Sequence, residues 1–164
     1  MNIFILDKDP IKSAQMLCDK HVCKMIVESC QLLCSVFYFN SNIIPPYKLT
    51  HKNHPCAKWT RLTKSNFKWL LKHLKELLNQ YTLRYNKIHK CQEIFNWIIN
   101  NIHQLYFSHY ELTPFVQCMP KQYQSNNVIE AYKEYYICEK LRFAKWKLNN
   151  IPQFVVNFNK HLNF

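Results

Sequence analysis

The sequence predicts an all-α protein that forms a single domain of about four helices over residues 1–164. Apolar residues recur at intervals of three and four along most of the chain, which is the helical period. The sequence has 164 residues and no glycine, so its helices must end on Asn or Pro. We find no internal repeat or low-complexity linker, and this length suits one domain.

The first predicted helix runs from Pro10 to about Phe39. Asp9 strengthens this assignment, because Asp caps helices and Pro favours the first helical position. Residues 40–46 contain two Asn and two Pro and should end the helix. Before it, the apolar residues 3–6 are expected to form a short extended segment.

The same spacing predicts three more helices. A loop with Pro114 and Pro120 should separate the last two, and an apolar tail follows from Asn149. The three helices are expected at about Cys56–Tyr85, about Lys90–Phe107 and about Ser125–Lys147.

The charge of the chain predicts a polyanionic partner. Lys and Arg number 22 against 10 Asp and Glu, which gives a formal net charge of +12. Nucleic acid is the first candidate and an acidic membrane surface the second. An AT-rich coding sequence would explain many lysines, but it would not explain so few acids. We therefore expect double-stranded DNA as the partner, with RNA or a nucleotide as the alternative, and a monomer that does not bind membranes.

The absence of glycine excludes several kinds of site. Gly-rich phosphate loops, dinucleotide-binding turns and nucleophile elbows all need glycine, and so do the hairpins of helix-hairpin-helix glycosylases. No apolar run reaches the roughly 18 residues that would span a bilayer. The first residues also lack a signal-peptide pattern, so we expect a soluble intracellular protein.

Eight cysteines are present, but none forms a Cys-x2-Cys pair. Zinc sites favour such closely spaced ligands. We therefore expect mostly buried free thiols in a reducing compartment, and we predict no metal and no cofactor.

A polar stripe on the first helix is the strongest candidate for a chemical site. His21, Lys24, Glu28 and Gln31 fall within about one quarter of the helix circumference. The rest of the helix is apolar, and charges on such a surface are costly unless they are paired or line a cleft. Glu28 and His21 are candidate catalytic residues, because a carboxylate can stabilise a cation or move a proton. Lys24 is either catalytic or an ion-pair partner of Glu28, and Asp19 on the opposite side is expected to be solvated.

A second group of polar and basic residues precedes and enters the second predicted helix. Donors at a helix N-terminus bind phosphates, and an aromatic ring among cations can stack on a base. The alternative is a polar loop with a capping Asn53 and a packed Trp59. On the first interpretation, the nucleic-acid-binding residues are Gln31, His51, Asn53, His54, Lys58, Trp59 and Arg61, with Lys140 and Lys145 adding charge from the last helix.

The motif Asp19-x-His21-x6-Glu28 resembles the first helix of the small pyrimidine-dimer DNA glycosylases, the phage endonuclease V-like family. His54-Pro55, Phe67-x-Trp69-Leu70 and Tyr132-x2-Tyr135-Tyr136-x3-Lys140 are similar to later segments of that family. The chain also resembles uncharacterised proteins of phages and large DNA viruses, through Cys18-Asp19-Lys20-His21, residues 51–55 and Met119-Pro120. Such a protein would act in the host cytoplasm or nucleus.

The resemblance implies an all-helical fold, a basic groove that kinks DNA, and base excision. In this family the N-terminal α-amine attacks the sugar C1′ and forms an imine that permits strand cleavage. Glu28 matches the catalytic Glu and His21 matches a supporting His. Asn2 is a large residue that favours retention of Met1, so Met1 would supply the amine, with Lys24 as an alternative amine.

The chain departs from the family around the catalytic Glu. Val27 and Gln31 stand where the family has arginines that contact the phosphates and the lesion. The expected activity is therefore a DNA glycosylase, with or without AP-lyase activity, on a damaged or modified base rather than a pyrimidine dimer. Two alternatives remain open: an enzyme that cleaves or modifies nucleotides or RNA on the same scaffold, and a non-catalytic basic module in which Glu28 is a structural ion-pair partner.

Overall fold

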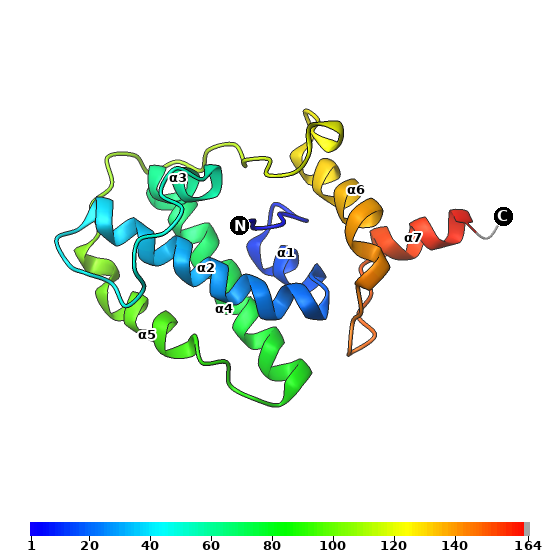
Figure 1. Ribbon diagram of the computed structural model, residues 1–164, viewed down its shortest axis with the longest axis horizontal. Coiled ribbons are helices and arrows are strands. Elements are labelled where there is room, and N and C mark those ends of the chain that lie inside the picture. The colour runs from blue at the N-terminus through cyan, green and yellow to red at the C-terminus, as the bar shows by residue number, and fades with distance from the viewer. Residues whose placement is uncertain (163–164) are drawn as a thin grey trace.

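Two long helices, α2 (Asp19–Asn40) and α4 (Lys64–Tyr85), form the centre of the fold (Figure 1). The computed structural model describes the chain through residue 162 and its side chains through residue 160. The described residues contain no strand, so the all-α prediction is confirmed, although they form seven α-helices rather than about four. The other five are α1 (Pro10–Met16), α3 (Pro55–Leu62), α5 (Gln92–Asn101), α6 (Val128–Lys140) and α7 (Gln153–Leu162).

The first predicted helix is in fact two helices, α1 and α2, with a break at Leu17 and Cys18. Both residues are extended, with ψ of 138° and 162°. The Cys18 amide donates to the Tyr136 hydroxyl at 2.9 Å, and the Asp19 amide donates to the Lys145 carbonyl at 2.8 Å. These acceptors lie more than a hundred residues away in sequence, so local spacing could not reveal the break.

The second predicted helix is also divided, at Thr63, which separates α3 from α4. Thr63 is extended, and its side chain accepts a hydrogen bond from the Asn66 amide, so it caps α4. The Thr63 hydroxyl also donates to the Glu111 carbonyl at 2.6 Å. A loop from the second half of the chain therefore fixes the break.

The remaining predicted helices are shorter than expected, and α7 was not predicted. α5 ends at Asn101 and passes into a 3-10 turn over Ile102–Gln104, while α6 begins after its cap Asn127. The predicted helix start at Pro10 is confirmed, and α3 begins at Pro55, one residue before the expected Cys56. α4 ends on Asn86 in the left-handed conformation, with φ of 52°, so here Asn serves where glycine is common.

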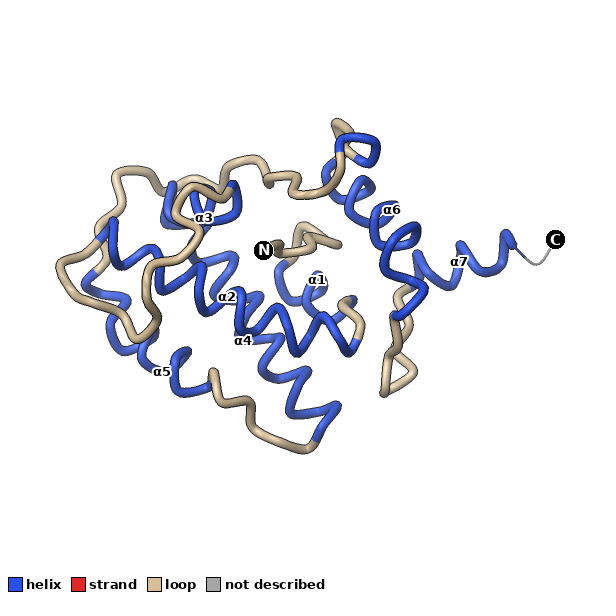
Figure 2. The backbone as a smooth tube through the Cα atoms, in the orientation of Figure 1, coloured by secondary structure: helices blue, strands red, loops and turns tan. Residues whose placement is uncertain are grey.

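The segment before α1 lies inside the core rather than on the surface. Ile3, Ile5 and Leu6 are completely buried, and Figure 2 draws the segment as a loop among the helices. It is not a strand. Its amides bond to side chains, as in the 3.0 Å bond from the Leu6 amide to the Ser13 hydroxyl. Buried amides need such partners, so the path of the segment is fixed.

Arg84 joins α4 to the break between α1 and α2. Its guanidinium is buried and donates to the Leu17 carbonyl at 2.8 Å and to the Gln15 carbonyl at 3.2 Å. It also pairs with Asp19 at 3.1 Å. The expectation that Asp19 is merely solvated is therefore wrong, because the residue has a structural partner.

The cysteines and α2 agree with a reduced, well-packed core. All eight cysteines are free thiols, and five of them are buried. α2 is long and apolar enough to cross a membrane by composition, but 61% of that stretch is buried within the protein. A core helix gives the same pattern.

We expect Arg84→Met to lower the free energy of unfolding by about 3–5 kcal/mol, because it leaves Asp19 and two carbonyls without their buried partner. Urea denaturation followed by circular dichroism measures the change. Lys87→Met removes an exposed charge nearby and should stay within about 0.5 kcal/mol of the parent. A loss below about 1 kcal/mol for Arg84→Met would show that the junction does not depend on this residue.

Candidate active site

The Glu28 carboxylate lies against the N-terminal segment. Its Oε2 accepts a hydrogen bond from the Asn2 backbone nitrogen at 2.9 Å, and its Oε1 lies 3.5 Å from the Lys24 ammonium. The Glu28 side chain is only 14% exposed, whereas that of Lys24 is 66% exposed. The ion pair considered for Lys24 therefore forms, but the same carboxylate is also held one residue from Met1.

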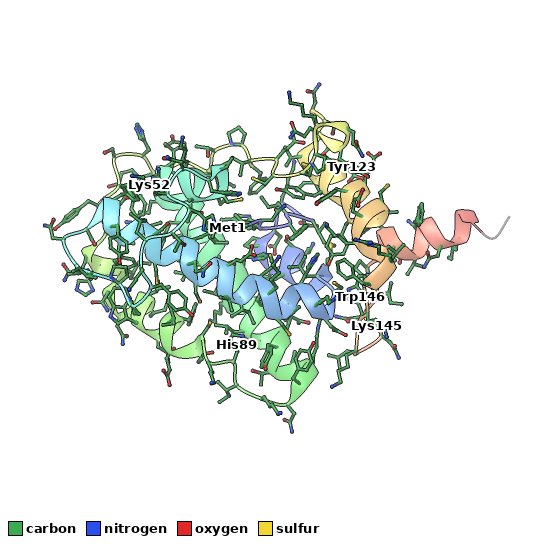
Figure 3. The ribbon with its side chains drawn as sticks, in the orientation of Figure 1. Met1, Lys52, His89, Tyr123, Lys145 and Trp146 are labelled. Carbon is green, nitrogen blue, oxygen red and sulfur yellow. The ribbon has the colours of Figure 1, made fainter. Side chains whose placement is uncertain are left out.

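The Asn2 side chain fixes this arrangement. Its Oδ1 accepts from the Ile3 and Phe4 amides at 2.8 and 3.0 Å, and its Nδ2 donates to the Cys118 carbonyl at 2.7 Å. The Tyr132 hydroxyl in turn accepts from the Cys118 amide at 3.1 Å. The loop before α6 thus forms a wall beside the first residues, and Figure 3 shows Met1 between α2 and this loop.

His21 is a buried neutral imidazole. Its Nδ1 lies 2.8 Å from the Tyr136 hydroxyl, which already accepts from the Cys18 amide. The direction of the bond between them follows the tautomer of the imidazole, because a hydroxyl can donate one hydrogen bond and accept two. Burial, with smaller contributions from Lys140, Lys24 and Lys20, lowers the pKa of His21 to about 4. His21 is therefore uncharged near pH 7.

Phe4 connects His21 to the last helices. It stacks on the His21 ring at 4.3 Å and lies parallel to Tyr135 at 6.2 Å. Its φ of 56° is in the left-handed region, which costs an aromatic residue of the order of 1–3 kcal/mol. The ammonium of Lys140 lies 4.6 Å from the centre of the Tyr135 ring. A stack of three rings therefore links the site to a predicted DNA-binding lysine.

His54 approaches the same site from α3. Its Nδ1 caps the helix by accepting from the Cys56 amide at 3.2 Å. Burial lowers the pKa of His54, and the positive charges of the N-terminal amine and His51 add to this, while Glu28 opposes it. The structure thus brings Glu28, His54 and the start of the chain together, although the sequence placed His54 only in the DNA-binding group.

The other predicted nucleic-acid contacts differ in their exposure. Trp59 is 3% exposed and packs against Trp69 and Phe115, so it belongs to the core and offers no face to a base. Arg61 donates to the Lys52 carbonyl at 2.7 Å and covers Phe39 at 4.3 Å, which orders the loop before α3. The capping residue is His54 rather than Asn53. The residues that stay exposed are His51, Asn53, Lys58 and Lys145, and Gln31 is half-buried.

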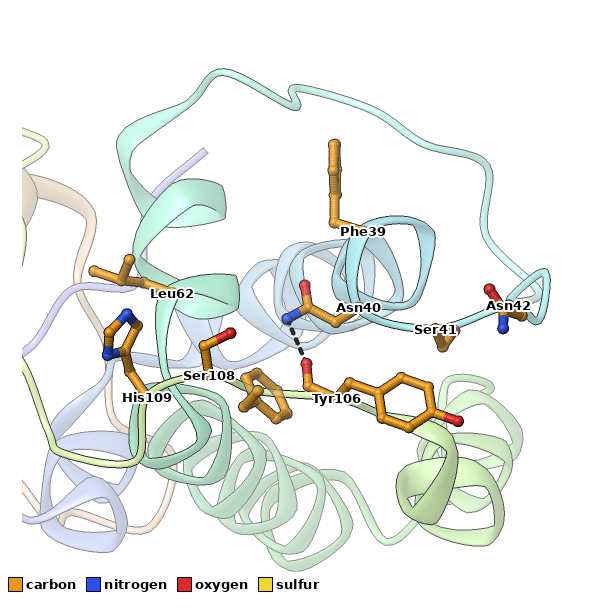
Figure 4. Close-up of a pocket in the computed structure, with 9 residues that line it drawn as sticks. Phe39, Asn40, Ser41, Asn42, Leu62, Tyr106, Ser108 and His109 are labelled. Atoms are coloured by element: carbon orange, nitrogen blue, oxygen red, sulfur yellow. Dashed lines mark hydrogen bonds between the residues drawn. The ribbon is translucent and has the colours of Figure 1, made fainter.

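A separate pocket of about 520 Å³ lies at the end of α2 (Figure 4). It is lined by residues such as Phe39, Leu62 and His109, and a 2.9 Å bond joins the Asn40 amide group to the Tyr106 carbonyl. None of the predicted catalytic residues lines it. The candidate chemistry is therefore beside Met1 and not in this pocket.

Sequence reasoning missed Asn2, Tyr136, Cys56 and Cys118 as parts of the site. Cys118 is 116 residues from Asn2 and 62 from Cys56, so spacing alone could not connect them. The only local signal was the His54-x-Cys56 pair at a helix start. Zinc motifs are usually recognised by two closely spaced pairs of Cys or His in the sequence. Cys118 stands alone on a loop, far in sequence from His54 and Cys56.

A family model described as pyrimidine dimer DNA glycosylase matches residues 1–93. The chain belongs to this family. No curated protein and no solved structure matches it. In this glycosylase the matched residues contain Met1, His21, Glu28 and His54, while Cys118, Tyr136 and Lys140 lie beyond them. The resemblance drawn from the sequence is confirmed, and the family's action on DNA agrees with the expected partner.

We expect the glycosylase to lose stability as the pH falls from 6.5 towards 4, partly through His21. Its pKa is about 4 in the folded state against an ordinary 6.5, so the unfolded chain binds the proton first and stability is complete only above this range. The shift corresponds to about 3 kcal/mol. Urea denaturation at several pH values should show a shallower pH dependence for His21→Asn. The exposed control His103→Asn should keep the parent slope, and an unchanged slope in His21→Asn would contradict a neutral buried His21.

Proposed function

We propose that this glycosylase removes a damaged or modified base from duplex DNA, with its N-terminal α-amine as nucleophile and Glu28 as the assisting carboxylate. The 2.9 Å hydrogen bond between the Asn2 nitrogen and Glu28 carries this proposal. It holds a carboxylate within one residue of the amine. If Met1 is retained, Met1 supplies the amine, and if Met1 is removed, the nitrogen already bonded to Glu28 becomes the amine.

The chemistry requires a free amine and a stabilised cation. The amine nitrogen bonds to the sugar C1′ as the bond from C1′ to the base breaks, and the base leaves with a proton. Positive charge develops on the sugar, and the nearly buried Glu28 carboxylate lowers its energy. One amine proton has left with the base. The bond from C1′ to the ring oxygen then breaks, the second amine proton passes to that oxygen, and an imine forms. Loss of a C2′ proton together with the 3′ phosphate would then cleave the strand.

His21 and Lys24 have supporting roles in this proposal. His21 is neutral and holds Phe4 in place through stacking, so it positions the segment that contains the amine. Lys24 pairs with Glu28 from the solvent side, which helps to hold the carboxylate in place. The exposed Lys24 remains the alternative imine-forming amine.

The surface around Met1 supplies the contacts to DNA. His51, Asn53 and Lys58 are exposed at the start of α3, where backbone amides also favour phosphates. Lys140 and Lys145 lie on the other side, at the end of α6 and beyond it. Figure 3 shows Lys52 and Lys145 on opposite sides of Met1. A duplex bridging these two groups would pass over the proposed amine.

The substrate is proposed to be a damaged or modified base other than the pyrimidine dimer. Val27 and the half-buried Gln31 occupy the positions next to Glu28 at which the resemblance places arginines. An amide can hydrogen-bond to a base edge, but it carries no charge for the phosphates of a kinked lesion. Specificity should therefore differ from that of relatives with arginines there.

We expect borohydride to trap a covalent adduct between the glycosylase and one damaged duplex from a set containing ultraviolet photoproducts, uracil, an abasic site and no damage. Glu28→Gln should lower turnover by at least about 100-fold without loss of helix content. Mass spectrometry of the adduct should find the DNA on the N-terminal peptide and show whether Met1 is present. Lys24→Gln should retain the adduct.

Three results would contradict this mechanism. An adduct that disappears in Lys24→Gln would assign the amine to Lys24. Cleavage of RNA or nucleotides without action on DNA would favour the second enzymatic hypothesis. Tight duplex binding that is equal in Glu28→Gln and the parent, with no product from any substrate, would favour a binding module.

We expect Lys58→Gln to weaken binding of undamaged duplex DNA and to reduce the slope of log affinity against log salt by about 1, because one phosphate contact is lost. Fluorescence anisotropy at several salt concentrations measures this slope. Lys87→Gln removes an exposed charge beyond α4 and should leave the slope unchanged. Equal slopes for both variants would place the duplex away from the start of α3.

A further inference from the structure

His54, Cys56 and Cys118 form a cluster of potential metal ligands beside Glu28 and the start of the chain. Their ligand atoms all lie within 4.8 Å of one another, and the two sulfur atoms are 3.4 Å apart. Cys56 is buried, while His54 and Cys118 are half-buried. We propose that these three side chains bind a zinc ion.

The type and spacing of the donors fit zinc. Thiolates and imidazole are the ligands that Zn²⁺ prefers in proteins, usually in a tetrahedron. With zinc–sulfur distances of about 2.3 Å, two sulfurs of a tetrahedron lie roughly 3.7 Å apart. The sulfurs of Cys56 and Cys118 would therefore need to separate by only a few tenths of an ångström.

The two cysteines are held by separate and well-anchored segments. Cys56 lies in the first turn of α3, after Pro55. Cys118 is fixed at both its backbone groups, since its amide donates to Tyr132 and its carbonyl accepts from Asn2. The pair therefore meets without requiring either segment to move.

The hydrogen bonding between the thiols also favours a cation. The Cys56 and Cys118 sulfurs are 3.4 Å apart, and either thiol can donate a hydrogen bond to the other. The two sulfurs thus share a proton at short range. A metal ion would replace that proton, as metals do at thiol sites.

Binding by His54 has a defined cost. Its Nδ1 accepts the 3.2 Å hydrogen bond from the Cys56 amide, and a neutral imidazole has only one free lone pair on nitrogen. The ring would give up this long bond to bind zinc through either nitrogen. The Cys56 amide lies at a helix start, where water can satisfy it.

Three protein ligands leave the fourth position of a tetrahedral zinc ion open. The N-terminal amine and Glu28, which the proposed mechanism uses, lie close to the site. The site is joined to them through Asn2, whose backbone nitrogen donates to the Glu28 carboxylate at 2.9 Å and whose side chain donates to the Cys118 carbonyl at 2.7 Å. Zinc bound at this site would therefore take the amine or Glu28 as a ligand and withhold that group from the proposed reaction. This inhibitory effect rests on the proposed function, whereas metal binding itself does not.

Cobalt tests the site directly. The full chain, freed of metal and kept reduced with a phosphine, should bind one Co²⁺ with the charge-transfer absorption of cobalt–thiolate bonds and the visible bands of a tetrahedral site. Zn²⁺ should displace it. Cys118→Ser and Cys56→Ser should each reduce the charge-transfer band and weaken zinc binding by at least about 100-fold, and His54→Gln should weaken binding while the band remains.

Cys138→Ser is the matched control, because Cys138 is an exposed thiol outside the cluster. It should bind cobalt like the parent, and circular dichroism should confirm that every variant is folded. The proposal is overturned if the reduced parent takes up no cobalt, or if its cobalt spectrum survives Cys118→Ser. It is also overturned if the two cysteines form only a disulfide. No DNA is present, so failure here leaves the proposed glycosylase mechanism untouched.

Discussion

The hydrogen bond from the Asn2 amide to the Glu28 carboxylate ties the first residues of the chain to the central helix. A carboxylate on a largely apolar helix needs such a partner, because its charge is costly to bury alone. The same bond directs residues 3–6 into the core, where three apolar side chains are fully covered. The rest of the site follows, since Asn2 reaches Cys118 and Phe4 reaches His21 only along this path.

The site has one dry side and one side open to solvent. On the dry side, His21 and Tyr136 are uncharged and serve as rigid packing around Phe4, with the hydroxyl satisfying both the imidazole and a backbone amide. On the open side, the exposed Lys24 ammonium pairs with Glu28, and the Cys118 carbonyl accepts from the Asn2 side chain. Such an asymmetry would suit the proposed covalent chemistry, because the chain start is held firmly on one side and faces solvent on the other.

The sequence predicted the features that depend on residues close together in the chain. The cap Asp9, the helical spacing of α2 and α4, and the closeness of Lys24 to Glu28 all depend on neighbours within one or two turns. The break at Leu17 and Cys18 and the burial of Trp59 depend instead on Tyr136, Lys145 and Phe115, which are distant in sequence. The pairing of Cys56 with Cys118 is of the same kind, so no spacing rule applied to one sequence could have found it.

The long sequence separation of the anchors has a kinetic consequence. The Asn2 side chain cannot form its hydrogen bond until Cys118, 116 residues later, has been synthesised. The break before α2 likewise needs Tyr136, which is 118 residues after Cys18. During synthesis, which proceeds at roughly 5–20 residues per second, residues 2–6 therefore stay uncovered for several seconds. Enzymes that trim or modify nascent chains would meet this segment before the fold closes over it.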